Sequence, residues 1–377
     1  MINTSLKDLA IYRSISSSAY FSYLSSKRVS KLDKKLNELW SDPATKTLET
    51  KNKKYAILSD FHIGNGSSID RFKKNEQVAL RALDYYYRNN YSLILLGDIE
   101  ELWRFSLGEI LKKYNNTIYK QIRKFGKDRV HRIFGNHDID WQNTDPIRNS
   151  GKEDHLAREA IKLKDIYGRD KILLVHGHQG TNDADTFSWL SKPVVRGYRY
   201  LEPLFLLQEG AASPSSKISS SFEKNRYKWA KDNKTILICG HSHRAVFCSR
   251  SKIDNLKNEI LVLKNKMQNT SSIIKKYKFI RQISDKELDK HMESLKGRRF
   301  DSLGENPLPC YFNTGCGLYH DGITLIEIVH DNIKLVKWNR HIKESRFEVY
   351  ENDSISECLD KLEMSSLEAP IRKLNTV

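Results

Sequence analysis

Five short motifs rich in Asp and His each follow an apolar run of strand length. They are D-F-H at 60–62, G-D-I-E-E at 97–101, G-N-H-D at 135–138, H-G-H at 176–178 and G-H-S-H at 240–243. In open α/β sheets, the residues of a site gather at the carboxyl ends of the strands. Carboxylate, imidazole and amide groups without a thiolate suit Mn²⁺, Fe²⁺ or Zn²⁺. The five motifs together therefore predict one metal site.

The carboxylates among these residues indicate a reaction. Hydrolysis of a phosphoester places negative charge on the attacking and leaving oxygens, and two cations about 3.5–4 Å apart stabilise both while activating a shared water. Such a pair needs one carboxylate that reaches both ions, and Asp98 is the natural bridge, with Asp60 as the second carboxylate. Two negative charges facing two dications leave net positive charge for a phosphate. We therefore expect a dinuclear metal-dependent phosphoesterase.

The elements that must position these motifs follow from the apolar pattern. Short apolar runs alternate with amphipathic helix patterns up to the last motif, which is typical of βαβ units. Strands are expected at 55–59, 93–96, 130–134, 172–175 and 236–239. Later runs at 311–313, 323–329 and 333–338 include a hairpin around Asp331-Asn332, because no helix fits between the last two. The pattern predicts an α/β core with an antiparallel end.

The N-terminal segment has its own helical pattern. Leu32, Leu36 and Leu39 with Trp40 form one apolar stripe before a stop at Asp42-Pro43. We therefore expect a helical N-terminal extension over residues 1–50.

A second segment, between 251 and about 304, interrupts the α/β alternation. Its heptad-like stripe consists of Ile253, Leu256, Ile260, Leu263, Met267, Ile274 and Tyr277. Residues 250–300 hold 14 Lys/Arg and 6 Asp/Glu, so they carry +8 of the chain's net charge of +17. Three interpretations stay open: a helical hairpin with a solvated basic face, a basic arm for nucleic acid, and a coiled coil that forms a homo-oligomer.

Composition narrows the class of protein and its partners. With 377 residues and 39% hydrophobic residues, the chain can bury a core. No apolar window is long enough for a transmembrane segment, and no apolar run near the start suits a secretory signal. Five cysteines without C-x-x-C spacing favour a reducing cytoplasm. The positive charge favours anionic partners: nucleic acid, anionic lipid or a phosphorylated substrate.

The motifs resemble those of the calcineurin-like metallophosphoesterase superfamily, whose pattern is D-x-H, G-D-x-x-[DE], G-N-H-[DE], an isolated His, and G-H-x-H. The match runs from Tyr55 to about His243, and Asn313-Thr314-Gly315 is similar to the family's late Asn-x-Gly turn. The resemblance implies a four-layered α/β/β/α sandwich. Around the predicted extension and insertion, the chain would divide into 1–50 extension, 54–248 core, 250–304 basic helical insertion, 305–345 end of the core, and 346–377 C-terminal tail.

The resemblance also implies roles for individual residues. One metal ion would be held by Asp60, His62, Asp98 and His243. The other would be held by Asp98, Asn136, His176 and His241. His137 would approach the scissile phosphate as general acid or positioning cation, and Asp138 would orient it. We expect two divalent ions, Mn²⁺ first, with Fe²⁺ or Zn²⁺ as alternatives.

Within the superfamily, residues 97–103 look closest to the bacterial branch that contains the UDP-2,3-diacylglucosamine hydrolases. His176-Gly177-His178-Gln179 is similar too, although that branch usually has His-Gly-Asp. Members of that branch carry Arg in place of His137 and are shorter, without the basic insertion. We expect a phosphoester or phosphodiester of nucleotide or nucleic-acid type as substrate. Alternatives are a nucleotide-lipid pyrophosphate, a phosphomonoester or phosphoprotein, and a protein that binds nucleic acid or a partner through the insertion.

Several residues near the motifs are candidates for binding the substrate or for supporting a metal ligand. His178 would line the pocket or hydrogen-bond a loop, Trp103 would stack on a base or fill the core, and Glu101 would support a ligand. Phosphate binding or ordinary surface pairing is expected of three arginines: Arg196, Arg199 and Arg244.

Overall fold

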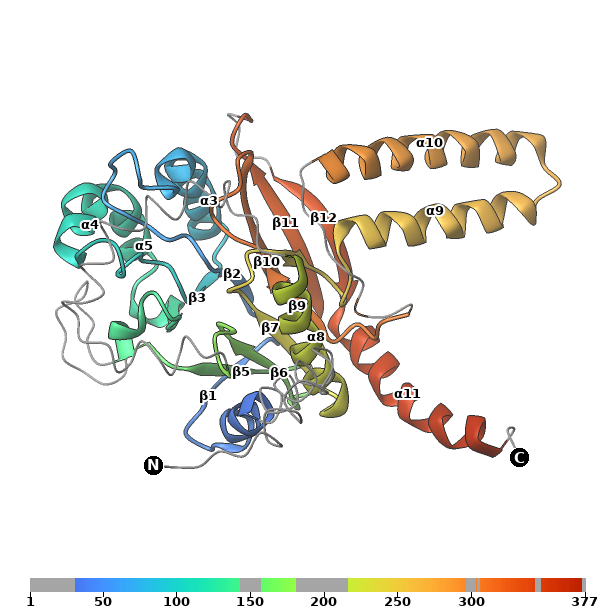
Figure 1. Cartoon of the computed structure of the whole chain (residues 1–377), viewed down its shortest axis with the longest axis horizontal. Helices are drawn as coiled ribbons and strands as arrows, with labels where there is room; N and C mark the ends of the chain where they lie inside the picture. The colour runs from blue at the N-terminus through green and yellow to red at the C-terminus, as the bar shows by residue number, and fades with distance from the viewer. Residues whose placement is uncertain are drawn as a thin grey trace, which may run out of the picture.

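The computed structural model describes residues 31–142, 157–180, 216–295, 303, 306–342 and 347–374. Their strands form two six-stranded sheets (Figure 1). The first sheet has the order β1 (Lys46–Glu49), β5 (Ala160–Lys164), β6 (Asp170–Val175), β7 (Ile236–Cys239), β9 (Tyr311–Thr314) and β8 (Ala245–Val246). The second has the order β12 (Glu348–Ser354), β11 (Asn332–Asn339), β10 (Gly322–Val329), β2 (Lys54–Leu58), β3 (Ser92–Leu96) and β4 (Val130–Ile133).

Alternation along the strands of the second sheet explains why the molecule has layers. In β2, Tyr55 and Ile57 belong to the core cluster shared with the first sheet, whereas Ala56 and Leu58 belong to the cluster under the outer helices. Successive side chains of a strand point to opposite faces, so an apolar strand without alternation needs cover on both faces. The sheets therefore pack face to face, and helices cover their outer faces.

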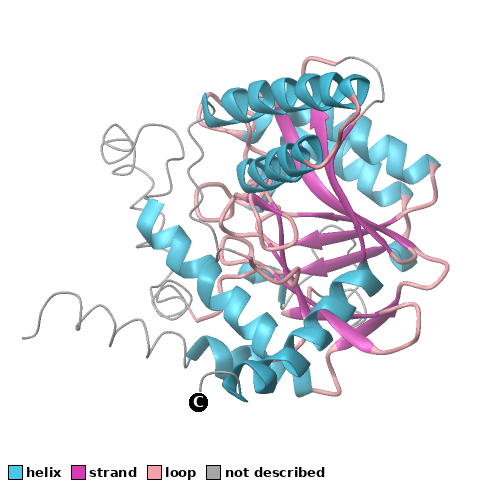
Figure 2. Cartoon of the chain, turned by 90° about the vertical axis from the view of Figure 1, so that its right-hand side faces the viewer, coloured by secondary structure: helices cyan, strands magenta, loops and turns pink. Residues whose placement is uncertain are grey.

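Two groups of helices provide this cover, as Figures 1 and 2 show. The second sheet is covered by α3 (Glu76–Arg88), α4 (Leu107–Tyr114) and α5 (Lys120–Lys124). The helix at 31–41, α8 (Ser216–Asp232) and α11 (Ile355–Leu374) contribute to the other core cluster. Short helical turns lie at Phe72–Asn75, Asn115–Tyr119, Lys127–Arg129 and Ile139–Gln142. The result is the expected α/β/β/α sandwich.

All eight strands expected from apolar runs are present, and the hairpin turns at Asp331 between β10 and β11. The strands β2, β3 and β4 run parallel, as βαβ units require. Four strands were not expected from the sequence: β1, β5, β8 and β12. The sequence of β5 is A-I-K-L-K, so Lys162 interrupts its apolar pattern. Lys162 is nevertheless buried, because its ammonium group donates to the backbone carbonyls of Trp40 and Asp42.

The two chain ends are more closely integrated than the expected extension and tail. Leu32, Leu36 and Leu39 are buried in the core, and β1 then pairs with β5 at the edge of the first sheet. Residues 1–30 lie outside the described residues. At the other end, β12 pairs with β11, and α11 buries Ile355 and Leu359. The C-terminal segment is therefore part of the fold rather than a tail.

The insertion forms a helical hairpin of α9 (Lys252–Gln268) and α10 (Ile273–Leu295), which projects from the body (Figure 1). The expectation that one apolar stripe continues past Thr270 is wrong, because the chain reverses there and Ile274 and Tyr277 are exposed. Between the helices stands N-T-S-S, whose side chains compete for backbone hydrogen bonds and disfavour a helix interior. Among the described helices, none is long and apolar enough to cross a membrane.

Candidate metal centre

The five sequence motifs lie in loops at the carboxyl ends of strands from both sheets. Asp60 and His62 follow β2, Asp98 follows β3, and Asn136 and His137 follow β4. From the other sheet, His176 follows β6, and His241 and His243 follow β7. Because the two sheets pack face to face, these loops meet at one edge of the sandwich. Most of the acidic and histidine side chains there are buried.

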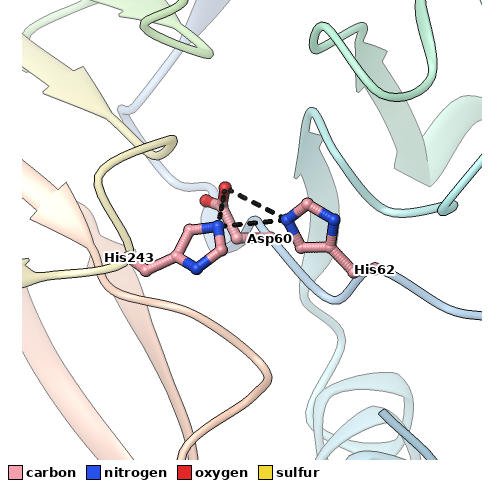
Figure 3. Close-up of side chains that lie close together, drawn as sticks. All are labelled: Asp60, His62 and His243. Carbon is pink, nitrogen blue, oxygen red and sulfur yellow. Dashed lines mark hydrogen bonds and ion pairs between the residues drawn. The ribbon is translucent and has the colours of Figure 1, made fainter. Parts of the chain in front are cut away.

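One cluster consists of Asp60, His62 and His243 (Figure 3). The Nε2 of His243 lies 3.2 Å from Oδ1 of Asp60 and 3.0 Å from Nε2 of His62. The Nε2 of His62 lies 3.9 Å from the same carboxylate oxygen. These three donor atoms point at one another, which is the arrangement that a cation between them would stabilise.

A second cluster consists of Asp98, His176 and His241. The Nε2 of His176 lies 3.0 Å from Oδ2 of Asp98. The same Asp98 oxygen lies 3.8 Å from Nε2 of His62 in the first cluster. Asp98 is therefore the carboxylate between the two clusters, the place that a bridging ligand requires.

Neighbouring groups prepare the imidazoles for metal binding. The Nδ1–H of His176 donates to the carbonyl of Leu96 at 2.8 Å, and Nδ1 of His62 lies 2.9 Å from Oε2 of Glu101. A histidine held through Nδ1 presents Nε2 as a lone-pair donor. The Oδ1 of Asn136 is buried and accepts no hydrogen bond from the described residues. An idle buried oxygen beside imidazoles and carboxylates fits a divalent cation.

The backbone at these positions is unusual. Left-handed φ angles occur at Asp60 (54°), His62 (46°), Asp98 (51°), His241 (66°) and His243 (55°). Non-glycine residues rarely adopt this region, and such strain collects at functional sites. Crossed hydrogen bonds between loops hold it: His62 N donates to Asp98 O at 3.0 Å, and His241 N donates to the Asp60 carboxylate at 2.9 Å. The loops thus fix one another.

Small residues allow this close approach. A Cβ at Gly135 would collide with the carboxylate of Asp98, and a Cβ at Gly97 would lie 2.5 Å from the His176 ring. Gly97 also has a φ of +81°. The glycines that open two of the motifs are therefore required by the space around the carboxylate and the imidazole.

His137 lies beside the clusters without joining the six donors above. Its Nδ1 lies 2.7 Å from Oε1 of Glu101, and its ring stacks on Trp103 with centroids 3.7 Å apart. Trp103 also donates from Nε1 to the carbonyl of Asn136 at 2.9 Å. Burial lowers the pKa of His137, but the carboxylates of Glu101 and Asp98 raise it to about 9. The two carboxylates thus favour the protonated form of this imidazole.

The expectation that Asp138 orients His137 is corrected by these contacts. Asp138 accepts from the backbone N–H of Gly135 at 2.6 Å and of Ile99 at 2.8 Å, so it joins the loops after β3 and β4. Burial and the charge of Asp98 raise the pKa of Asp138 to about 7. The carboxylate that holds the imidazole is Glu101, which lies between His62 and His137.

The residues expected to bind substrate have different surroundings. His178 is buried behind the second cluster, with its ring centroid 5.6 Å from that of His176, and burial lowers its pKa to about 3. Trp103 covers His137 instead of standing free for a base. Arg244 is partly exposed and directly follows His243. Arg196 and Arg199 lie outside the described residues.

Three more residues support the ligand loops, and only Asn313 belongs to a motif. Ser59 lies 2.6 Å from the hydroxyl of Thr314 and also contacts Asp60, which fixes that carboxylate. Tyr319 donates to the carbonyl of His243 at 2.7 Å. Asn313, signalled by the Asn-x-Gly turn, donates from Nδ2 to the carbonyl of Gly240 at 2.7 Å. No motif marks Ser59 or Tyr319, because single hydroxyls are common in any chain.

Comparison with known proteins identifies the family of this chain. The calcineurin-like phosphoesterase family model matches residues 53–245, just over half of the chain. A structure described as a dimetal phosphatase from Danio rerio is 10% identical with a TM-score of 0.32, over 80% of this chain and 100% of that one. No curated protein matches in sequence. The family match spans all five motifs, and the chain belongs to the calcineurin-like phosphoesterase family, whose members hydrolyse phosphoester bonds.

Proposed function

We propose that this protein is a two-metal hydrolase that cleaves phosphodiester bonds of nucleotide-type substrates. The observation that carries the proposal is the position of Asp98, one buried carboxylate between two clusters that each contain histidine. Such a carboxylate would be shared by two cations. The remaining donors would divide into Asp60, His62 and His243 on one side and His176, His241 and Asn136 on the other.

Two divalent cations held there would supply an activated water and positive charge for the phosphate oxygens. The donors are hard oxygen atoms and imidazole nitrogens, so Mn²⁺ suits them, with Fe²⁺ and Zn²⁺ as alternatives. The protein's own contribution is orientation. Hydrogen bonds to Leu96 and Glu101 fix the His176 and His62 rings, and Asp60 is fixed by Ser59 and the His241 backbone.

His137 would act on the leaving group. Glu101 contacts Nδ1 of His137 and Trp103 stacks on its ring, so Nε2 is the atom that would donate a proton to the substrate. When the bond between phosphorus and the leaving oxygen breaks, that oxygen takes the Nε2 proton, and the imidazolium becomes a neutral imidazole. Such a general acid contributes roughly 10²–10⁴-fold to the rate.

A nucleotide-type substrate is supported by the excess of basic residues, which gives a net charge of +17. A second candidate, a nucleotide-lipid pyrophosphate, is favoured by the exposed apolar side chains at the end of the α9–α10 hairpin. The five cysteines are free thiols, which supports a cytoplasmic location. For the basic insertion, nucleic acid and a second copy of the chain are the alternatives to the lipid surface proposed below.

A hydrolysis panel tests the proposal. The purified chain with Mn²⁺, Fe²⁺ or Zn²⁺ would be given bis-p-nitrophenyl phosphate, p-nitrophenyl phosphate, DNA, RNA and a nucleotide-sugar pyrophosphate, with Asp98→Asn as the blank. We expect the diesters to be cleaved faster than the monoester, and only by the wild type. Cleavage of the pyrophosphate alone would select the second candidate. Equal rates for wild type and Asp98→Asn would reject hydrolysis at this site.

A further inference from the structure

Charge and apolar exposure are concentrated at the outer end of the α9–α10 hairpin. We call residues 260–284, which surround the turn, the hairpin tip. The tip contains six Lys/Arg and no Asp or Glu, whereas all six acidic residues of the hairpin lie nearer its base. Lys286 pairs with Glu259 at the base, and Lys264 of the tip pairs with Glu287 of the base. The base is thus a stabilised two-helix stalk, and the tip is purely cationic.

The tip also exposes large hydrophobic side chains. Of the twelve such side chains that are exposed among the described residues, six lie in the tip: Leu261, Val262, Ile273, Ile274, Tyr277 and Ile280. Ile274 is 84% exposed and Tyr277 is 72% exposed. Soluble surfaces carry single apolar residues without consequence, but a contiguous patch marks an interaction site. This concentration of exposed apolar side chains therefore indicates an interaction site.

Helix geometry places the exposed residues on one face of α10. Ile273, Tyr277 and Ile280 recur at intervals of four and three residues, so they share a face. The half-buried Phe279 lies on the opposite side, where it lines the space between α10 and α9. Arg281 lies on this face and Lys276 and Lys278 flank it, whereas Lys275 lies on the side toward α9. An apolar face with flanking lysines is the pattern of a helix that lies in a membrane interface.

The space between the helices has the same character. A cavity of about 440 Å³ opens at the tip between α9 and α10. Lys266 and Lys275 line it, together with Asn265 and Asn269. Two ammonium groups and two amides suit the phosphate of a lipid headgroup.

We propose that the hairpin tip docks on an anionic lipid bilayer, with the exposed aliphatic side chains in the interface and the lysines on headgroup phosphates. Nucleic acid fits less well, because bases bind by stacking on aromatic rings, whereas the exposed apolar side chains of the tip are aliphatic apart from Tyr277. A second copy fits less well, because two all-cationic tips repel. Docking is independent of the proposed function, since no metal-centre residue lies in the hairpin.

Vesicle co-sedimentation of the full chain tests this proposal, with vesicles of phosphatidylcholine alone or mixed with phosphatidylglycerol. We expect the wild type to bind only the anionic vesicles. Ile274→Asp should weaken binding at least tenfold, since it removes an interfacial side chain and adds a repelled charge. The matched control is Leu288→Asp, which makes the same change at an exposed residue on the same face near the base. It should bind like the wild type.

Charge and alternative partners complete the test. Lys275→Gln with Lys276→Gln should weaken binding to anionic vesicles by roughly tenfold or more at low salt. All variants should keep wild-type helicity and hydrolyse the same aryl phosphate equally well. The proposal is overturned if the wild type does not bind anionic vesicles, or if Leu288→Asp loses as much binding as Ile274→Asp. Binding to RNA or DNA but not to vesicles, or sedimentation as a dimer that Ile274→Asp dissociates, would instead assign the tip to nucleic acid or to a second copy.

Discussion

The metal centre and the hairpin tip depart from the ordinary arrangement of a folded protein in opposite ways. At the centre, charged and polar side chains such as Asp60, Asp98 and His176 are almost completely buried. At the tip, Ile274 and Tyr277 stand in solvent. Buried polar groups and exposed apolar groups both cost free energy unless a partner is present. A binding partner would account for each region: cations at the metal centre and a lipid surface at the hairpin tip.

The two regions also differ in how tightly neighbours hold them. At the centre, each ligand loop is hydrogen-bonded to another, so one substitution should disturb several donors. In the hairpin, ion pairs join partly exposed side chains and contribute about 0–1 kcal/mol each. We therefore expect large effects of substitution at the centre and small effects on catalysis at the tip. Four experiments test that ranking.

The largest effect is expected for Asp98→Ala. Removing the carboxylate between the clusters takes a ligand from both cations, and the loss of several kcal/mol of charge stabilisation should lower kcat by at least about 10³-fold. Bound metal, measured by elemental analysis, should fall as well. Asn136→Ala should weaken only one ion.

A control is Asp165→Asn. Asp165 is as buried as Asp98, but it accepts hydrogen bonds from Tyr167 and Arg169 in the turn between β5 and β6. It should lower stability without changing metal content. Two tightly bound ions and near-normal turnover in Asp98→Ala would contradict the assignment.

His137→Gln should lower kcat by roughly 10²–10⁴-fold while metal content stays at the wild-type level. The loss should be smaller for p-nitrophenyl esters, because good leaving groups need little protonation. His320→Gln, at an exposed histidine, is the control and should have no effect. An equal loss for all substrates would make His137 a positioning residue instead of an acid.

Glu101→Gln should have an intermediate effect. Glu101 contacts Nδ1 of both His62 and His137, so its loss should weaken metal affinity and activity by about 10–100-fold each. Titration of activity with Mn²⁺ measures the shift. The control Glu109→Gln changes a carboxylate that caps α4 and should leave the titration unchanged. A wild-type titration for Glu101→Gln would remove Glu101 from the metal site.

The smallest effect on catalysis is expected when residues 261–281 are replaced by a short glycine-rich turn. The stalk keeps the buried Leu256 and Ile260 and the contact between Lys286 and Glu259, so the body should stay folded. Hydrolysis of a small aryl phosphate should stay near the wild-type rate, as continuous assays can show. A loss of more than about tenfold, or 1.4 kcal/mol, would place part of the catalytic machinery in the hairpin.

Sequence patterns predicted most of the fold because apolar strands leave a direct signal. They missed β5, because Lys162 interrupts its apolar run and is buried only through hydrogen bonds from its ammonium group to backbone carbonyls. They also missed β12, whose polar residues suit an edge strand. At the site, motif spacing brought the predicted ligands to one place. The partner of His137 was missed because Glu101 and Asp138 are both acidic neighbours in their motifs, and only the folded loops decide which one reaches the ring.

The pairing of β2 with β10 has a consequence for biosynthesis. Ile57 lies opposite Ile326, and 264 positions separate the end of β2 at Leu58 from the start of β10 at Gly322. At about 5–20 residues per second, a ribosome needs roughly 13–50 s to add that length. Throughout that time one edge of β2 has no partner, and the α9–α10 hairpin emerges before the sandwich is closed. Nascent chains that stop before residue 322 should therefore depend on chaperones, because an open apolar strand edge recruits other chains.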